Sequence, residues 1–209
     1  MGIPVYLAVQ NEAAINYPKK YLAQTGYGLR RDGHLRIPVH TMNCPVIIDD
    51  AVMGWQEKVL KSLAVYCRNG YILDFERPFN AEHRKIINAL PQNQLLALPA
   101  AFHTVKLKAL PVFSCPVPCN SWRGFLQKCQ QQFQNGWMLE ITPWDQQKYT
   151  GPGEDHGILP QSICAFSKSG GKITYFDTKK TICEKLEAAQ SFGCMAAIAL
   201  YDEVKALRK

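Results

Sequence analysis

The segment Asn69 to Pro78 reads NGYILDFERP, and it predicts a strand that carries chemistry. Successive side chains of a strand point to opposite faces. One face therefore receives a small, an apolar and two acidic residues, and the other receives only large apolar or aromatic ones: Gly70, Ile72, Asp74 and Glu76 on the first, Tyr71, Leu73 and Phe75 on the second. In a parallel barrel the apolar face packs under the helices. The two acids would then point to the axis, at the carboxyl end where barrel enzymes hold their active sites.

Apolar runs and amphipathic segments alternate along the whole chain, which is typical of an α/β protein with a parallel sheet. The candidate strands are Pro4 to Val9, Pro45 to Asp49, Tyr71 to Glu76, Gln94 to Leu98, Leu110 to Cys115, Trp137 to Thr142, Ser162 to Ser167 and Cys194 to Leu200. The candidate helices are Trp55 to Cys67, Ala81 to Leu90, Ser121 to Phe133, Thr178 to Ser191 and Asp202 to Lys209. Asn80 and Asn120 are the expected caps of the second and third helices.

Eight strands with interleaved helices predict a compact (β/α)8 TIM-like barrel, formed by residues 1–209 as a single domain. The alternative is a doubly wound open sheet. The barrel is favoured because no glycine-rich phosphate motif follows the first strand and because the strands spread over the entire chain. A β-hairpin insertion near the N-terminus is predicted over Tyr27 to Val39, a second hairpin turn at Ser169 to Gly171, and a polar loop bordering the active site over Lys148 to Gly157.

The composition predicts a soluble globular protein: 209 residues, 47% of them hydrophobic, and no run near the ~20 apolar residues of a membrane span. The first residues carry no basic stretch before their apolar run, so we expect no signal peptide and a cytoplasmic location. The net charge of +7 comes from scattered Lys and Arg without interleaved aromatic residues, which argues against a nucleic-acid partner.

The eight cysteines mostly lie within apolar or helical stretches, as buried thiols do. Only Cys115 and Cys119 form a close pair, and no second pair completes a tetrahedral zinc site. No two of the five histidines have metal-ligand spacing, and surface or capping roles are expected for them, including His83 on its predicted helix. We expect no metal and no organic cofactor.

The acidic face of Asn69 to Pro78 indicates acid–base chemistry. Asp74 and Glu76 are about 7 Å apart along one face of a strand. Mutual repulsion and partial burial of two such carboxylates raise one pKa, which keeps a proton for general-acid catalysis. Glycosidases divide their work between two carboxylates in this way.

The same segment resembles the signature strand of the family 18 glycoside hydrolases, the chitinase-like barrels, whose pattern is D-G-x-D-x-D-x-E. Gly70 matches the glycine, Asp74 the last aspartate and Glu76 the glutamate. Upstream, CPVIIDDAVMGW is similar to the family's third strand and its following loop, and SFGCMAAIALYDE is similar to its closing strand. The resemblance implies that Glu76 protonates the glycosidic oxygen, while Asp74 orients the N-acetyl group of the substrate that attacks the anomeric carbon.

The sequence also departs from this pattern. Asn69 stands where the family has its first aspartate and Ile72 where it has the middle one, so the inward acidic column falls from three members to two. The later Met-x-Tyr-Asp strand has no clear counterpart, since WMLEITPWD ends on Trp144 and Asp145. The tryptophan of the closing strand is absent, and Tyr201 is the nearest aromatic residue. These departures predict a degenerate member.

Further candidates lie where predicted strands end, and we expect them to bind substrate. They are Gln10 beyond the first strand, Asp49 (or its neighbour Asp50), Glu140, Trp144 beside a polar loop, and Tyr201. Gln10 offers hydrogen bonds to hydroxyls, and the aromatic rings offer faces for pyranose stacking. For the acids, the alternative is a cap or an acid that stabilises a loop.

The sequence thus predicts a glycoside hydrolase that acts on N-acetylhexosamine-containing glycans, with an oligosaccharide as its partner. One alternative is a catalytically inactive barrel that binds carbohydrate or a protein partner, as Ile72 suggests. Another is a glycosidase of a different barrel family that uses Glu76 with Glu140 or Asp145, at the ~5 to 10 Å that two-carboxylate mechanisms need. The sequence does not predict an oligomeric state.

Overall fold

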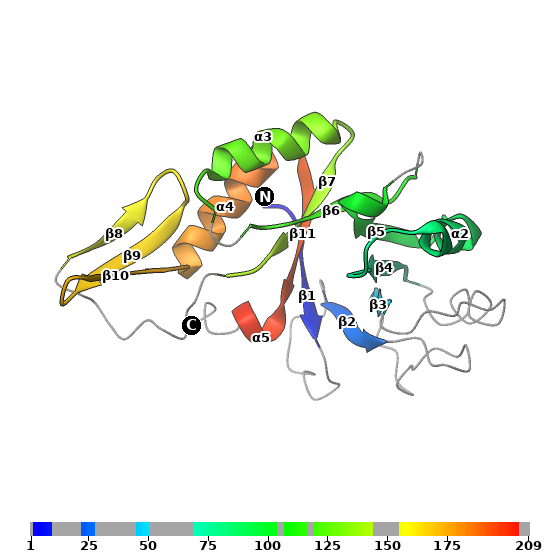
Figure 1. The fold of residues 1–209 in the computed structure, drawn as a ribbon, viewed down its shortest axis with the longest axis horizontal. Helices are drawn as coiled ribbons and strands as arrows, with labels where there is room; N and C mark the ends of the chain where they lie inside the picture. The colour runs from blue at the N-terminus through cyan, green and yellow to red at the C-terminus, as the bar shows by residue number, and fades with distance from the viewer. Residues whose placement is uncertain are drawn as a thin grey trace. The chain divides into compact units, whose positions relative to one another are not determined.

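The computed structural model describes residues 2–9, 22–27, 45–50, 69–103, 107–116, 119–143 and 155–204. Within them, eight strands form a closed barrel in the order of the chain, and the last strand pairs with the first. Figure 1 labels these strands along the chain. These strands are β1 (Val5–Val9), β2 (Leu22–Tyr27), β3 (Val46–Asp49), β4 (Tyr71–Asp74), β5 (Leu95–Pro99), β6 (Leu110–Ser114), β7 (Trp137–Ile141) and β11 (Cys194–Leu200). Neighbours with a defined register pair in parallel. The predicted α/β barrel is confirmed, and the doubly wound alternative is wrong.

The helices of the described residues are α2 (Ala81–Ala89), η3 (Ala100–Phe102), α3 (Trp122–Gln132), α4 (Lys179–Ser191) and α5 (Tyr201–Val204). The chain divides into two compact units: residues 6–112, here called the N-terminal unit, and residues 1–5 with 113–209, called the C-terminal unit. The prediction of one domain over residues 1–209 stays a prediction.

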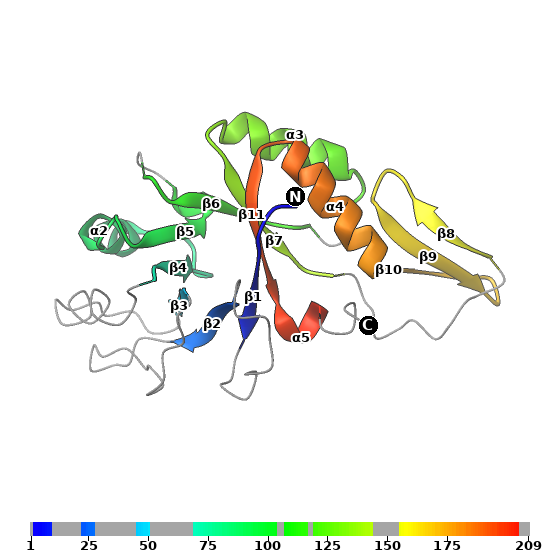
Figure 2. The same cartoon turned by 180° about the vertical axis from the view of Figure 1, so that it is seen from behind.

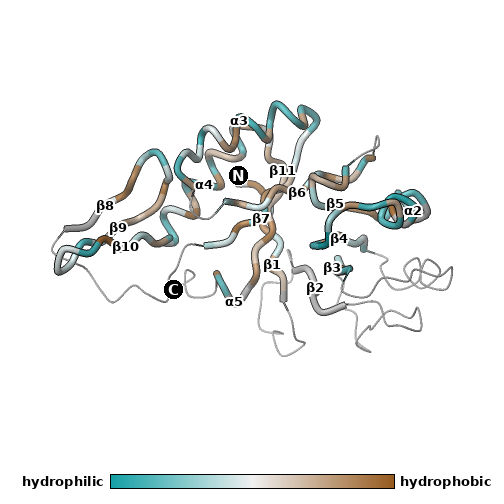
Figure 3. The backbone as a smooth tube through the Cα atoms, in the orientation of Figure 1, coloured by the Kyte–Doolittle hydropathy of each residue, from teal (hydrophilic) through white to brown (hydrophobic). Residues whose placement is uncertain are grey.

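Burial in the N-terminal unit follows the alternation predicted for β4. Tyr71, Leu73 and Phe75 are fully or almost fully buried, and they belong to one core cluster with Ile87 and Leu90 from α2 and its end. The cluster continues through Ile48, Leu95, Leu98, Phe102 and Ala109. In Figure 3, α2 carries both brown and teal segments, as an amphipathic helix does. The aromatic face of β4 therefore packs under its helix.

Gly70 fixes the entry to β4. Its φ of +92° lies in a region that L side chains rarely adopt. A Cβ here would lie 2.7 Å from the Leu96 side chain, and the next amide, that of Tyr71, donates to the Gln94 carbonyl at 2.9 Å. A glycine is thus required where the strand begins to pair with its neighbour.

Two strand assignments from the sequence need correction. Ser162 to Ser167 is not a barrel strand: β9 (Cys164–Ser169) pairs in antiparallel fashion with β8 (Asp155–Leu159) and β10 (Lys172–Phe176) in a separate three-stranded sheet. The eighth barrel strand is β2, which pairs in parallel with β1 and β3. Its sequence LAQTGY has too few apolar residues to be recognised as a strand. It forms one because the neighbouring strands supply backbone hydrogen bonds, which do not depend on its side chains.

The predicted turns and caps have mixed outcomes. The turn at Ser169 to Gly171 is confirmed, since Gly170 and Gly171 have φ of 53° and 76° between β9 and β10. The side chain of Asn80 accepts from two amides at the start of α2, as expected. The cap of α3 is Ser121 rather than Asn120, because the Ser121 hydroxyl accepts from the Gly124 amide.

Other predicted segments lie partly or wholly outside the described residues. Of the hairpin predicted over Tyr27 to Val39, only Tyr27 is described, and it ends the parallel strand β2. Of the loop predicted over Lys148 to Gly157, only its last three residues are described, and they begin β8. The helix predicted over Trp55 to Cys67 is not covered.

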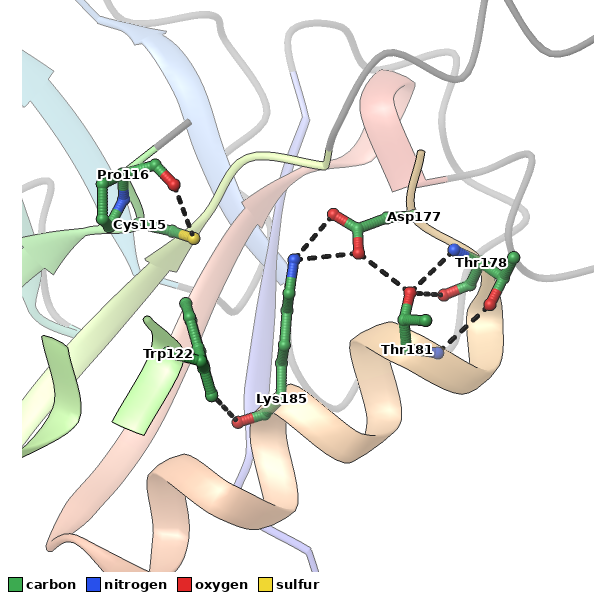
Figure 4. A network of polar contacts seen from close by, with 7 residues as sticks. All are labelled: Cys115, Pro116, Trp122, Asp177, Thr178, Thr181 and Lys185. Carbon is green, nitrogen blue, oxygen red and sulfur yellow. Dashed lines mark hydrogen bonds and ion pairs between the residues drawn. The ribbon is translucent and has the colours of Figure 1, made fainter. Parts of the chain in front are cut away.

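In the C-terminal unit, α3 and α4 lie side by side and α4 contacts β11 (Figure 2). A buried polar network anchors the start of α4 (Figure 4). Lys185 donates to both carboxylate oxygens of Asp177 at 2.8 and 2.9 Å, and the Thr181 hydroxyl donates to the same carboxylate at 2.8 Å. Thr178 and Thr181 complete a capping box, and the Lys185 ammonium lies 5.5 Å from the centroid of the Trp122 ring.

Lys185 and Asp177 are each 2% exposed, so each ion depends on the other for compensation. Replacing Lys185 with Met leaves the Asp177 carboxylate buried without a counter-ion, which costs about 3–5 kcal/mol. We expect urea denaturation to show a loss of that size for Lys185→Met and a much smaller one for Lys185→Met combined with Asp177→Leu. The control is Lys180→Met, since the Lys180 side chain is 73% exposed in its pair with Glu184. Equal losses of unfolding free energy for Lys185→Met and Lys180→Met would contradict the prediction.

Candidate functional site

The end of β4 presents both predicted catalytic acids. Asp74 is the last residue of the strand and Glu76 lies two residues beyond it, and both side chains are exposed. Ile72, on the same face, is 3% exposed. This face thus changes from apolar and buried to acidic and exposed toward the carboxyl end of β4. The sequence predicted acids at this end but expected them to be partly buried.

Asp50, one residue beyond β3, accepts hydrogen bonds from the backbone at Glu76 and at the next residue. Its side chain is buried at 2% exposure, and its Oδ1 accepts from the Glu76 amide at 3.1 Å. Its Oδ2 accepts from the Arg77 amide at 3.2 Å and lies 3.0 Å from Nε2 of His83. The sequence offered an acid that stabilises a loop as the alternative reading of Asp50, and that reading is correct.

The sequence reasoning missed the partner of this aspartate. Of the surface or capping role expected for His83, the surface role is wrong, since the residue is fully buried, while the capping role is confirmed, since its ring accepts from the Asn80 amide at the start of α2. His83 lies 33 residues from Asp50 in the chain. No local pattern joins two residues so far apart. The only available signal was a histidine three residues after the helix cap Asn80, on the face of α2 that also carries Ile87.

A second acidic group belongs to the C-terminal unit. The Glu140 carboxylate on β7 accepts from the Ser114 hydroxyl at the end of β6 at 2.6 Å. Phe113, the residue before, packs against Phe133 and Trp137, so alternation places Ser114 and Glu140 on the opposite face of the sheet. Burial raises the pKa of Glu203 on α5, and the negative charge of Glu140 adds to the effect.

The remaining predicted site residues are only partly covered. Gln10, Trp144 and Asp145 lie outside the described residues. The backbone of Asp49 ends β3 in register with Asp74, and Tyr201 begins α5, but their side chains are not among those described. The roles of these residues, and the reach between Glu76 and Glu140 or Asp145, stay predictions.

Six cysteines fall within the described residues, and all six are free thiols. Five are buried and Cys183 is exposed, which confirms the buried-thiol interpretation for Cys115, Cys119, Cys129, Cys164 and Cys194. Among the described residues, no three His, Cys, Asp or Glu side chains form a group that could hold a metal ion. No helix in the described part of the chain is long and apolar enough to span a membrane.

Comparison with solved structures identifies the fold. The spore cortex-lytic enzyme SleL of Bacillus megaterium superposes with a TM-score of 0.60 at 12% identity, over 94% of this chain and 70% of that one. A plant class V chitinase from Cycas revoluta in complex with (GlcNAc)3 gives a TM-score of 0.61 at 10% identity, over 98% and 97%. The class V chitinase of Nicotiana tobaccum gives 0.58 at 10%, over 95% and 93%.

This chain has the chitinase-like fold of family 18. The resemblance seen in the sequence is thereby confirmed for the fold. No protein-family model matches the chain, and no curated protein matches it either.

The cysteines give a direct test of burial. Desolvation raises the pKa of Cys115, Cys129 and Cys194 to about 12 each, so their thiols stay protonated and unreactive at pH 8. We expect iodoacetamide at pH 8 to label Cys183 first and to leave these three unmodified until the protein is denatured, as read by peptide mass spectrometry. Labelling of any of the three at the rate of Cys183 would contradict the assignment.

Glu203 gives a test by pH. Because its pKa is raised in the folded state, folding favours the protonated form of Glu203, so the contribution of this group to stability is most favourable at acidic pH and declines as the group ionises. Glu203→Gln removes that decline. We expect the melting temperature of the variant to exceed that of the wild type at pH 7.5, and the difference to shrink toward pH 4. A difference independent of pH would rule out this role of the carboxyl group.

Proposed function

We propose that this protein is a glycoside hydrolase that acts on N-acetylhexosamine-containing glycans, with Glu76 as the general acid and Asp74 as its partner. The observation that carries the proposal is the pair of exposed carboxylates at the carboxyl end of β4 in a barrel with a chitinase-like fold. Support for a saccharide substrate comes from solved neighbours, which include chitinases in complex with (GlcNAc)3 and (GlcNAc)4.

The proposed reaction needs protonation of the glycosidic oxygen and attack on the neighbouring anomeric carbon. Glu76 donates its proton to the glycosidic oxygen, and the bond from that oxygen to the anomeric carbon breaks. The carbonyl oxygen of the substrate's own N-acetyl group attacks the anomeric carbon, while Asp74 accepts a hydrogen bond from the acetamido N–H and stabilises the positive charge that develops. Water then attacks the anomeric carbon and breaks its bond to the acetamido oxygen, which restores the N-acetyl group, and Glu76 takes up a proton from the water, so the acid is restored.

Ile72 restricts how this pair can work. It occupies the position before Asp74 on the same face, and it is buried at 3% exposure. An aliphatic side chain neither shares a proton with Asp74 nor repels its charge. In this proposal Asp74 orients the acetamido group, and Glu76 cycles the proton.

Ile72 is also the observation that favours a second candidate function, a catalytically inactive barrel that binds carbohydrate or a protein partner. Ile72 stands where the family's signature strand has an aspartate, so the acidic residue that this strand places before Asp74 on the same face is replaced by an aliphatic one. Isothermal titration with an N-acetylglucosamine oligomer distinguishes the two functions, because a silent binder takes up the oligomer and leaves it intact.

Glu76→Gln is the central test of the proposed activity. The amide keeps the shape of the side chain but cannot donate the carboxyl proton, so release of a chromophore from an aryl chitooligosaccharide should fall about 10²- to 10⁴-fold. Circular dichroism should be unchanged, because the Glu76 side chain is exposed. The matched control is Glu82→Gln, an exposed glutamate in the first turn of α2. An unaffected rate in Glu76→Gln would overturn the assignment.

A further inference from the structure

Three hydrogen-bond donors converge on the buried carboxylate of Asp50, and they come from two parts of the N-terminal unit. Two are consecutive backbone amides, those of Glu76 and Arg77, at 3.1 and 3.2 Å. The third is the His83 ring of α2, at 3.0 Å. A carboxylate at 2% exposure has lost almost all its hydration, so these donors replace the water that it gave up.

The hydrogen bonds assign the protons of His83. Its Nδ1 lies 3.2 Å from the Asn80 amide, which can only donate, so Nδ1 is the acceptor. The ring proton therefore sits on Nε2 and is donated to Asp50. Aromatic rings of Phe75, Phe79 and Phe102 surround the imidazole, with centroids 5.2, 6.2 and 4.9 Å away. The surrounding rings fix the position of the imidazole, and the contact with Asn80 fixes which of its nitrogens donates to Asp50.

The bond from the Glu76 amide links this cluster to the acid of the proposed reaction. The amide nitrogen is one covalent bond from the Glu76 Cα, and the side chain leaves from that same Cα. β4 ends at Asp74, so no strand pairing holds the backbone at Glu76. Asp50 supplies the hydrogen bonds that the strand no longer provides.

We propose that Asp50, held by His83, is a positioning residue that sets the backbone of Glu76 and thereby aims its carboxyl group. This inference rests on the proposed function for its catalytic consequence. The hydrogen bonds themselves do not depend on that function. Asp50 touches no reacting atom, so its effect falls on the chemical step rather than on substrate affinity.

Asp50→Asn is the sharpest variant, because it preserves size and removes one acceptor. The amide has a single acceptor oxygen, and its NH2 group is a donor. With its oxygen in the place of Oδ2, the Arg77 and His83 bonds survive and the NH2 group faces the Glu76 amide, donor against donor. In the reverse orientation, two donors are left without an acceptor. At least one backbone amide or the histidine therefore loses its partner in either orientation.

The experiment combines amide hydrogen exchange with steady-state kinetics on the full chain. Exchange at the Glu76 amide or at the Arg77 amide, read by mass spectrometry at single-residue resolution, should be faster in Asp50→Asn than in the wild type, and the amide that exchanges faster shows which orientation the new side chain takes. On the aryl chitooligosaccharide, kcat should fall about 10- to 100-fold while KM stays within about twofold. The control is Glu82→Gln, since Glu82 is exposed on α2, the helix that carries His83. This variant should change neither the amide exchange nor the kinetics.

His83→Phe is the second variant, because it keeps an aromatic ring in the aromatic pocket while it removes the donor to Oδ2, together with the acceptor of the Asn80 amide. Asp50 then retains both backbone amides with a less fixed orientation. We expect the same changes as in Asp50→Asn but smaller ones. If Asp50→Asn fails to fold, His83→Phe decides the question by the same criteria.

The outcomes separate the two proposals. Faster exchange with a lower kcat and an unchanged KM supports the positioning role. Faster exchange with an unchanged kcat, or unchanged exchange in a folded variant, overturns it. A wild type that does not cleave the substrate overturns the proposed hydrolase and with it the catalytic consequence, while the exchange measurement still reports whether Asp50 holds the two amides.

Discussion

Burial of the aromatic face of β4 against α2 decides where the acids of this strand point. Tyr71, Leu73 and Phe75 are at most 4% exposed, and fully burying one such side chain contributes about 1.5–3 kcal/mol. A shift of register by one residue would bring Asp74 and Glu76 into that core and would expose the aromatic rings. The direction of both carboxylates therefore follows from the packing on the opposite face, and no interaction of the acids themselves is needed to set it.

The sequence predicted the parts of the fold that depend on local periodicity. The alternation of β4 and the apolar faces of α2, α3 and α4 are local, and each was found with bounds close to those of the structure. Periodicity identifies a strand but not its partner. Ser162 to Ser167 was consequently assigned to the barrel, although β9 pairs within the separate three-stranded sheet, while LAQTGY lacked the pattern and yet forms β2.

In the candidate site, too, the sequence predicted what lies on one strand and missed what pairs across the fold. Asp74 and Glu76 were found because both lie on one predicted strand, whereas the pairing of Asp50 with His83 spans 33 residues and leaves no trace in either local sequence. At identities of 9–12% with solved neighbours, the fold is shared while most side chains differ. A fold of this kind constrains which positions lie at the carboxyl ends of the strands but not which residues occupy them.

In the described part of the chain, buried aspartates lie at the starts of two helices. Asp177 directly precedes the cap of α4 and accepts hydrogen bonds from Thr181 and Lys185 of that helix, so it stabilises the helix start. Asp50 contacts α2 through His83, and it also accepts hydrogen bonds from two backbone amides beyond the end of β4. Burying a carboxylate opposes folding unless its partners compensate it. A fixed amide at Glu76 suits the proposed hydrolase, because its general acid must meet a glycosidic oxygen, whereas Ile72 favours the silent binder.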